Sequence, residues 1–107
     1  MKRITFKIAI NKNYHGYEEG DEIKTGYLFV IPLLPNHYFT VHKYNSTEWI
    51  VSEYSTGRHV SSGKTRKDAI CHAIDRLSNS IDEWGKLRVL EEISLHPVIN
   101  KSEATNE

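Results

Sequence analysis

The spacing of the apolar residues changes near Thr65, and this change limits the folds that the chain can adopt. Upstream of it, apolar and polar residues alternate, most regularly at Ile4, Phe6, Ile8 and Ile10. Such alternation is typical of a β-strand with one buried face. Downstream of it, apolar residues recur at intervals of three and four, as on one face of an amphipathic helix. The sequence therefore predicts a sheet followed by C-terminal helices.

Four more segments are predicted to be strands, at residues 25–35, 37–44, 48–54 and 58–62. The first is apolar on both faces as far as Ile31, which indicates a central strand, and Pro32 must end its hydrogen bonding or lie at an edge. The second and third are joined by a short polar turn, which favours a hairpin. Residues 11–22 have no periodicity, so we expect a loop there that is long enough to be a working surface.

The helical stripe consists of six apolar positions, Ala69, Ile70, Ala73, Ile74, Leu77 and Ile81. Thr65 followed by Asp68 has the character of a capping box, which places the helix start at Thr65. Residues 78–96 contain a polar interruption and then a second apolar stripe. They form either a kinked continuation of the helix or a second helix capped by Ser80, and Pro97 ends the helical region.

Together these elements predict an α+β fold, in which an antiparallel sheet of four to five strands carries one or two C-terminal helices packed on one face. At 107 residues the chain is one domain, which we place at residues 1–97. The end of the chain has no apolar face, so residues 98–107 are expected to be a disordered C-terminal tail.

Charge and cysteine content narrow the classes of function. Lysine and arginine together number 14, as do aspartate and glutamate, so the formal net charge is zero. Nucleic-acid-binding domains usually carry a basic excess, and the balance argues against that class. The single cysteine, Cys71, excludes an intramolecular disulfide. No apolar run is long enough to span a membrane, so we expect a cytoplasmic protein without membrane association.

The segment from Gly57 to Thr65 has some of the letters of a P-loop, which holds nucleotide phosphates. A P-loop has four residues between its first glycine and the Gly-Lys-Ser/Thr triplet, whereas five separate Gly57 from Gly63 here. The extra residue disrupts the cluster of backbone amides that would converge on one phosphate. We therefore interpret both glycines as turn residues between a strand and a helix.

No set of residues predicts catalysis, a cofactor or a metal site. Cys71 and His72 are adjacent on the expected helix, so their side chains diverge by about 100° and cannot act as nucleophile and base. Six histidines are present, but a metal site would need residues such as His42 and His59 to converge with a carboxylate. We expect no enzymatic activity.

Two regions are candidates for binding a protein partner. If the helices cover one face of the sheet, the opposite face stays open and carries side chains favoured as interface anchors. These are Tyr38, His42, Tyr44 and Tyr54. The predicted loop carries an acidic cluster that could imitate nucleic-acid phosphates toward a basic partner. It consists of Glu18, Glu19, Asp21 and Glu22.

The expected helix start is basic, which gives an alternative site. Lys64, Arg66 and Lys67 oppose the helix dipole there. Exposed first-turn amides beside three cations are suited to phosphate or to a partner's carboxylates. With Arg58, these residues form the alternative prediction, an RNA- or DNA-binding site whose affinity falls with salt.

Within residues 37–77, one stretch resembles the end of a double-stranded RNA-binding domain. In that family a strand is followed by a serine or threonine, two basic residues, any residue and an alanine. Thr65, Arg66, Lys67 and Ala69 match this pattern. The resemblance implies that Arg66 and Lys67 grip phosphates across a groove.

The same stretch is similar to the sheet-and-helix module of HicB-type antitoxins, whose helix opens with a glycine, a threonine and an acidic residue before an alanine. Gly63, Thr65, Asp68 and Ala69 fit. The combination of a Thr-Gly turn, a strand and "SGKTRKDAI" also resembles small orphan proteins of Gram-positive phages and mobile elements. This resemblance implies a protein that acts by binding a host or rival protein.

We therefore expect a small non-enzymatic binding protein, encoded by a phage or mobile element, that regulates or inhibits a host or rival protein in the bacterial cytoplasm. Its contacts would be with a protein of unidentified kind. The sequence does not define the oligomeric state and leaves a homodimer open. The alternative is an RNA- or DNA-binding module that uses the basic helix start.

Overall fold

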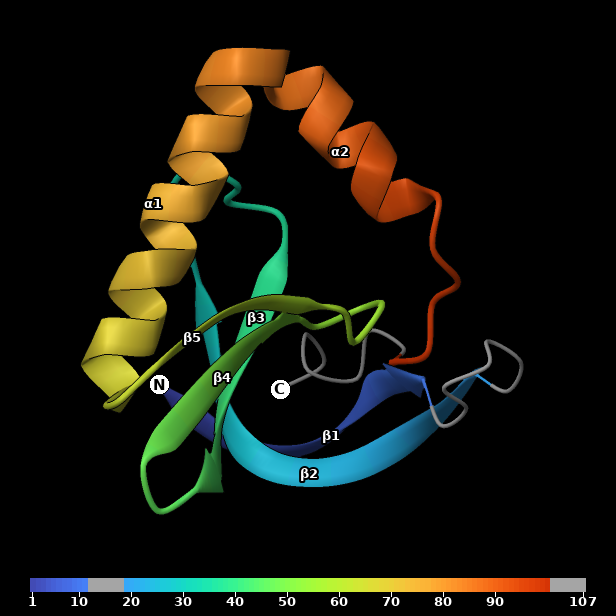
Figure 1. The fold of residues 1–107 in the computed structure, drawn as a ribbon. Helices are drawn as coiled ribbons and strands as arrows, with labels where there is room; N and C mark the ends of the chain where they lie inside the picture. Colours follow the sequence, from blue (N-terminus) through green and yellow to red (C-terminus); the bar gives the residue numbers. More distant parts are fainter. Residues whose placement is uncertain (12–18, 101–107) are drawn as a thin grey trace.

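The structure, a computed structural model, describes residues 1–11 and 19–100, with side chains described for residues 1–9 and 22–100 (Figure 1). Five strands form one antiparallel sheet in the order β1-β2-β3-β4-β5, and two helices follow them. The strands are β1 (Lys2–Asn11), β2 (Glu19–Val30), β3 (Tyr38–Asn45), β4 (Glu48–Glu53) and β5 (His59–Gly63). The helices are α1 (Arg66–Trp84) and α2 (Lys86–Ser94). This architecture confirms the predicted α+β fold.

β1 and β2 form a long hairpin, in which Asn11 lies opposite Glu19. The predicted loop over residues 11–22 is therefore wrong for Asn11, which belongs to β1, and for residues 19–22, which pair with β1. Backbone pairing with a neighbouring strand holds these polar residues extended, although they have no apolar alternation. The rest of the predicted loop, residues 12–18, lies outside the part of the chain that the structure describes.

Helix α1 begins where the sequence predicts. The side-chain oxygen of its N-cap residue, Thr65, accepts a hydrogen bond from the amide of Asp68 at 3.0 Å. The break between the helices comes at Gly85, whose positive φ of 86° is a conformation that glycine adopts readily. Of the two alternatives for residues 78–96, the second helix is correct. Its predicted cap at Ser80 is wrong, because the polar interruption stays inside α1 and the glycine sets the break.

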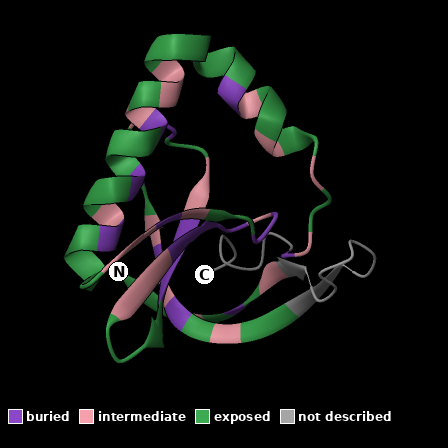
Figure 2. Ribbon diagram, in the orientation of Figure 1, coloured by how far each residue is buried: buried purple, intermediate pink, exposed green. Residues whose placement is uncertain are grey.

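The larger core lies between α1 and the sheet, on the face that we call the helix side. The residues at its centre are fully buried; they are Phe39, Val41, Val51, Ala69 and Ala73. The two alanines let α1 approach the strands closely, and a Cβ at Gly63 would lie only 2.5 Å from the amide nitrogen of Ala69. Figure 2 shows buried residues on the strands and on the sheet-facing side of α1, whereas most of α2 is exposed.

The opposite face, which we call the inner side, is closed by the sheet itself. The β1–β2 hairpin curves strongly (Figure 1), and the amide of Ala9 donates to the carbonyl of Gly57 in the β4–β5 turn at 2.9 Å. Gly57 has a positive φ of 68°, which this turn requires. Phe6, Leu28 and Tyr54 form a second, smaller core beneath the curved hairpin.

The chain after α2 returns to the sheet. The amide of Lys7 donates to Oδ1 of Asn100 at 2.8 Å, and Nδ2 of Asn100 donates to the carbonyls of Lys7 at 2.7 Å and Tyr54 at 2.6 Å. One side-chain amide thus replaces a neighbouring strand at the free edge of β1. The predicted tail over residues 98–107 is therefore wrong in where it begins, because the domain extends to Asn100. Residues 101–107 are not among those described.

Candidate functional site

Helix α1 covers only part of the helix side. It packs on β3, β4 and β5, and Ser61 Oγ of β5 donates to the carbonyl of Ala69 at 2.7 Å, which fixes one flank of the helix. β1 and β2 lie beyond the opposite flank. The aromatic side chains that β2 places on this side of the sheet, such as Tyr27, are only half-buried.

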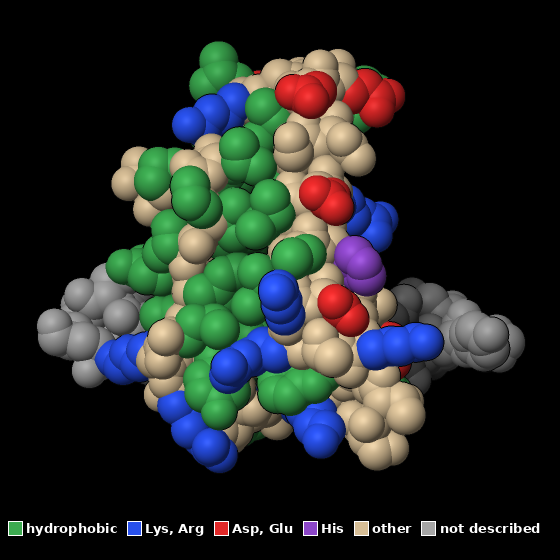
Figure 3. All heavy atoms as spheres, turned by 90° about the vertical axis from the view of Figure 1, so that its left-hand side faces the viewer, with side chains coloured by type: hydrophobic (Ala, Val, Ile, Leu, Met, Phe, Trp, Pro, Cys, Tyr) green, Lys and Arg blue, Asp and Glu red, His purple; other side chains and the backbone are tan. Residues whose placement is uncertain are grey.

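Side chains from α1 and β2 line this uncovered strip, and Figure 3 shows hydrophobic side chains in a band beside α1. We call it the α1–β2 surface; its members are Tyr27 and Phe29 of β2, Leu33 of the segment after β2, and Ile70 and Ile74 of α1. Each isoleucine follows a buried alanine by one position, so it is turned about 100° around the helix, away from the core contact. The band is therefore the outer edge of the main core, left open to solvent.

One end of the α1–β2 surface is basic. Arg66 in the first turn of α1 places its guanidinium 4.8 Å from the centre of the Tyr27 ring, a cation–π contact. Arg3 lies directly opposite Tyr27 in the β1–β2 register, so both side chains share one face of the sheet. Lys43 is exposed two residues beyond Val41, which faces Tyr27 from β3. Figure 3 shows Lys and Arg side chains gathered at the lower end of the band.

This combination is suited to holding another protein. Apolar area removed from water contributes roughly 25 cal/mol per Å². Arg3 and Arg66 present planar guanidinium groups that can donate paired hydrogen bonds to a carboxylate. The isoleucine, leucine and phenylalanine side chains of the band carry no polar atoms, so they offer contact and no acid–base chemistry.

The open aromatic face expected from the sequence is closed at two of its four positions. His42 is 1% exposed and Tyr54 is also buried, whereas Tyr38 is half-buried and Tyr44 is 57% exposed. The expectation is wrong at His42 and Tyr54, because the curved β1–β2 hairpin covers the inner side and brings the ring of Phe6 to 5.7 Å from His42. A binding role for Tyr38 and Tyr44 stays a prediction.

His42 is an unusual residue for the interior of the inner side. Among the described residues, neither of its ring nitrogens has a hydrogen-bond partner. Burial lowers the pKa of His42 from 6.5 to about 4, with Lys24 adding to the effect. The imidazole is therefore neutral near pH 7, as a buried ring without a nearby acceptor should be.

The predicted acidic cluster is described only in part. Glu18 lies outside the described residues, and Glu19 and Asp21 belong to β2 without described side chains. Glu22 is exposed and forms an ion pair with Lys24. A partner-binding role for the cluster stays a prediction.

The basic helix start is exposed, as the alternative prediction requires. Lys64, Arg66 and Lys67 all face solvent around the beginning of α1. Arg58 is also exposed, but it precedes β5 and is separated from Lys64 by the whole length of that strand. The structure therefore groups three of the four predicted residues and adds basic residues from β1 and β3.

The other motifs considered in the sequence lie in turns, strands and the first helix. Gly57 lies in the turn before β5, which confirms its interpretation as a turn residue, whereas that interpretation is wrong for Gly63, which is the last residue of β5 and pairs with Trp49. On α1, Cys71 is exposed, and Nδ1 of His72 lies 2.7 Å from the carbonyl oxygen of Ser62.

Within the described ranges, no group of three or more His, Cys, Asp or Glu side chains could hold a metal ion. No helix there has the length and apolar character needed to cross a membrane.

The α1–β2 surface is not evident from the sequence. Ile70 and Ile74 belong to the same helical stripe as Ala69 and Ala73, and Tyr27 lies in a segment that is apolar on both faces, as a covered strand would be. One signal was present: a stripe with apolar residues at two consecutive positions per turn is wider than one packed face requires. The contribution of Arg3 could not be seen, because it depends on strand register.

Comparison with known proteins identifies no relative of this chain. Searches against protein-family models, curated proteins and solved structures found no match. The resemblance of residues 37–77 to other modules therefore stays a prediction, and function has to be argued from the surface itself.

Proposed function

We propose that this chain is a small non-enzymatic binding protein that regulates or inhibits another protein by direct contact through the α1–β2 surface. The observation that supports this most is the uncovered apolar band beside α1. A chain that needed this area only for its own core would cover it with a helix or with polar side chains. Here the helix is held toward β5 and the band remains open.

The charges at one end of the band suggest the chemistry of the partner. Arg3, Lys43 and Arg66 lie around Tyr27. A partner that places apolar side chains on the band and carboxylates at its basic end would match both features. We therefore expect an apolar contact segment that is acidic at one end.

Site-specific photo-crosslinking in cells of the source organism tests this proposal. A photo-crosslinking amino acid at position 74 should form an adduct with a protein. The same group at Asp82, which is exposed on α1 away from the band, should not. Arg66→Glu should reduce the adduct at position 74 about tenfold, the effect of losing roughly 1.4 kcal/mol of contact.

The controls separate this surface from the other candidates. An adduct at Tyr44 but not at position 74 would contradict the proposal and move the site to the end of the inner side. Equal adducts at positions 74 and 82 would indicate random collision and would also contradict it. An adduct that disappears after nuclease treatment would point to nucleic acid.

Nucleic-acid binding is a second candidate, because Lys64 and Lys67 are exposed beside Arg66. Titration of labelled duplex RNA and duplex DNA, read by fluorescence anisotropy at low and high salt, tests it. Binding through these cations would weaken steeply with salt and would be lost in Lys64→Glu/Lys67→Glu. No anisotropy change at low salt would eliminate this candidate and leave the protein-binding proposal intact.

A further inference from the structure

Helix α2 packs Val89, Leu90 and Ile93 against the main core but leaves other large apolar side chains exposed. Only Val89 of this helix is buried, whereas Leu87 is 77% exposed. Trp84 and Leu95, which flank the helix, are exposed as well. Figure 1 shows α2 following α1 at an angle; it packs on α1, and Val89, Leu90 and Ile93 contact the main core. Large apolar side chains exposed within one short segment of the chain suggest an interaction site.

α2 is also poorly specified as an isolated helix. It has nine residues, fewer than the roughly 12–15 that an isolated helix needs, and its N-cap Gly85 provides no side-chain hydrogen bond. Its charges oppose its dipole, because Lys86 and Arg88 lie near its N-terminus while Glu91 and Glu92 lie toward its C-terminus. The helix is therefore held by the packing of Val89, Leu90 and Ile93 on the core and not by its caps or its charge order.

We propose that α2 is the contact between two copies of this chain, packed antiparallel on the α2 of a second copy around a twofold axis. A twofold contact requires a surface that is complementary to itself. In an antiparallel pair, the basic half of each helix faces the acidic half of the other. The charge order that weakens a single helix then becomes attractive across the contact, and the exposed Leu87 and Leu95 are covered.

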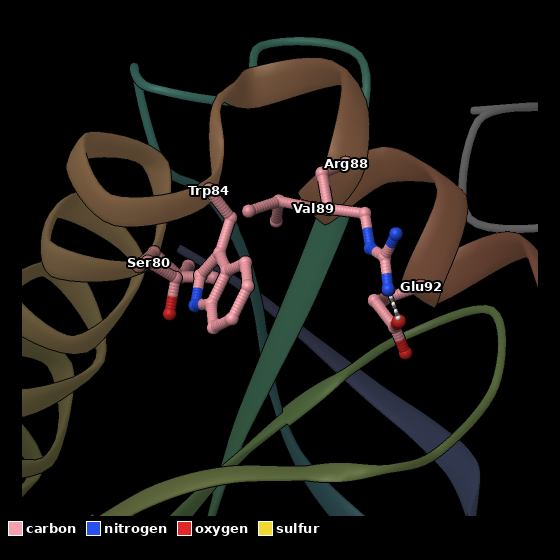
Figure 4. Close-up of a pocket in the computed structure, with 6 residues that line it drawn as sticks. Ser80, Trp84, Arg88, Val89 and Glu92 are labelled. Atoms are coloured by element: carbon pink, nitrogen blue, oxygen red, sulfur yellow. Dashed lines mark ion pairs between the residues drawn. The ribbon is translucent and has the colours of Figure 1, made fainter.

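A hollow between α1 and α2 borders the proposed contact. It has a volume of about 430 Å³ and is lined by Leu77, Ser80, Trp84, Arg88, Val89 and Glu92. Figure 4 shows the side chain of Val89 directed toward Trp84, with the Arg88–Glu92 ion pair at the border. That pair is weak, because Nη2 of Arg88 lies 3.5 Å from Oε1 of Glu92 and both side chains are more than half exposed. The hollow opens on the flank of α2 that carries Arg88 and Glu92, beside the face that carries Leu87.

Sedimentation equilibrium of the full chain tests the contact. The unchanged protein should dimerise, and Leu87→Asp should raise the dimer dissociation constant at least about 100-fold. Ile23→Asp is the matched control, since Ile23 is a 65% exposed apolar residue on β2, and it should leave dimerisation unchanged. Far-ultraviolet circular dichroism checks that both variants remain folded.

Charge exchange tests the arrangement of the two helices. Lys86→Glu/Arg88→Glu makes α2 wholly acidic and Glu91→Lys/Glu92→Lys makes it wholly basic, so each variant alone should be monomeric. An equimolar mixture should form dimers again. Recovery on mixing shows that charges meet across the contact, which a merely local effect on helix stability would not produce.

A monomer at the highest soluble concentration of the unchanged protein would overturn the proposal. So would a Leu87→Asp variant that dimerises as tightly as the unchanged protein. Loss of dimerisation in Ile23→Asp alone would place the contact on the sheet instead of on α2. Neither a monomeric unchanged protein nor an insensitive Leu87→Asp variant bears on the α1–β2 surface, so the two proposals fail or survive separately.

Discussion

The helix side and the inner side of the same sheet differ in whether the buried polar side chains of their strands find hydrogen-bond partners. On the helix side, the hydroxyl of Ser61 donates to the carbonyl of Ala69, and the buried carboxylate of Glu53 accepts hydrogen bonds from the amide and hydroxyl of Thr56. On the inner side, Thr40 Oγ1 and both ring nitrogens of His42 have no partner among the described residues.

The difference indicates which side sets the stability of the domain. A buried polar group without a partner costs roughly 1–3 kcal/mol, while a satisfied one contributes about 1 kcal/mol. The helix side combines a large apolar core with satisfied polar groups. The inner side has a small core closed by a curved hairpin. We therefore expect the helix side to dominate the free energy of unfolding and the inner side to respond to conditions.

Truncation of one phenylalanine on each side should show the largest effect and the clearest contrast. Phe39→Ala removes a fully buried ring from the main core and should lower the free energy of unfolding by about 3–5 kcal/mol. Phe6→Ala should cost less, about 2–3 kcal/mol, because β1 is an edge strand that can relax into the space. Urea unfolding measures both, and equal losses would contradict the ranking.

The pH dependence of stability should come from the inner side. The pKa of His42 is lowered to about 4 from 6.5, so below pH 6.5 the unfolded chain takes up a proton that the folded chain does not. Stability from this group is therefore full above pH 6.5 and falls with pH down to about 4, a loss of about 3 kcal/mol. Of the charged groups that act on the ring, Lys24 and His59 favour its neutral form and Glu22 opposes them.

Two variants isolate this contribution. His42→Leu should remove most of the pH slope and should raise stability, because it replaces two unsatisfied nitrogens with an apolar group of similar size. His59→Gln, at an exposed position, should keep most of the slope. An unchanged slope in His42→Leu would show that other groups control acid stability.

The closure of the inner side should depend on Asn100. Asn100→Ala removes three hydrogen bonds to Lys7 and Tyr54, and we expect a loss of about 1–3 kcal/mol. Hydrogen exchange at the amide of Lys7 should accelerate. Val98→Ala, at an exposed position in the same segment, should leave both measurements nearly unchanged, and a loss of equal size there would assign the effect to the segment as a whole.

The elements of this fold could be predicted where they are encoded locally. Alternation defined β1 and a run of apolar residues defined the second half of β2, while Thr65 with Asp68 defined the start of α1. The curvature that closes the inner side could not be predicted, because it rests on the contact between Ala9 and Gly57 and on Gly26. A Cβ at Gly26 would lie 2.3 Å from the carbonyl oxygen of Val41. Contacts between distant residues leave no periodic signal in the sequence.

Less of the candidate site than of the fold could be predicted from the sequence. The basic character of Arg66 at the helix start was evident, but its position over the ring of Tyr27 depends on how α1 lies across the sheet. Arg3 joins the site only through its register with β2. A surface assembled from three elements that are distant in sequence needs the packed structure before its members can be named.

The smallest effect should come from the N-cap of α1, at the exposed margin of the helix side. Thr65→Ala removes the hydrogen bond from the Asp68 amide to the threonine oxygen and should lower the free energy of unfolding by about 1 kcal/mol. Thr65→Ser keeps an oxygen in place and should preserve nearly all of it, so urea unfolding of the pair separates the cap from the lost methyl group. Because the helix side is held mainly by its core, neither variant should alter the pH slope. A change in that slope would mean that the two sides of the sheet are coupled more closely than their separate cores suggest.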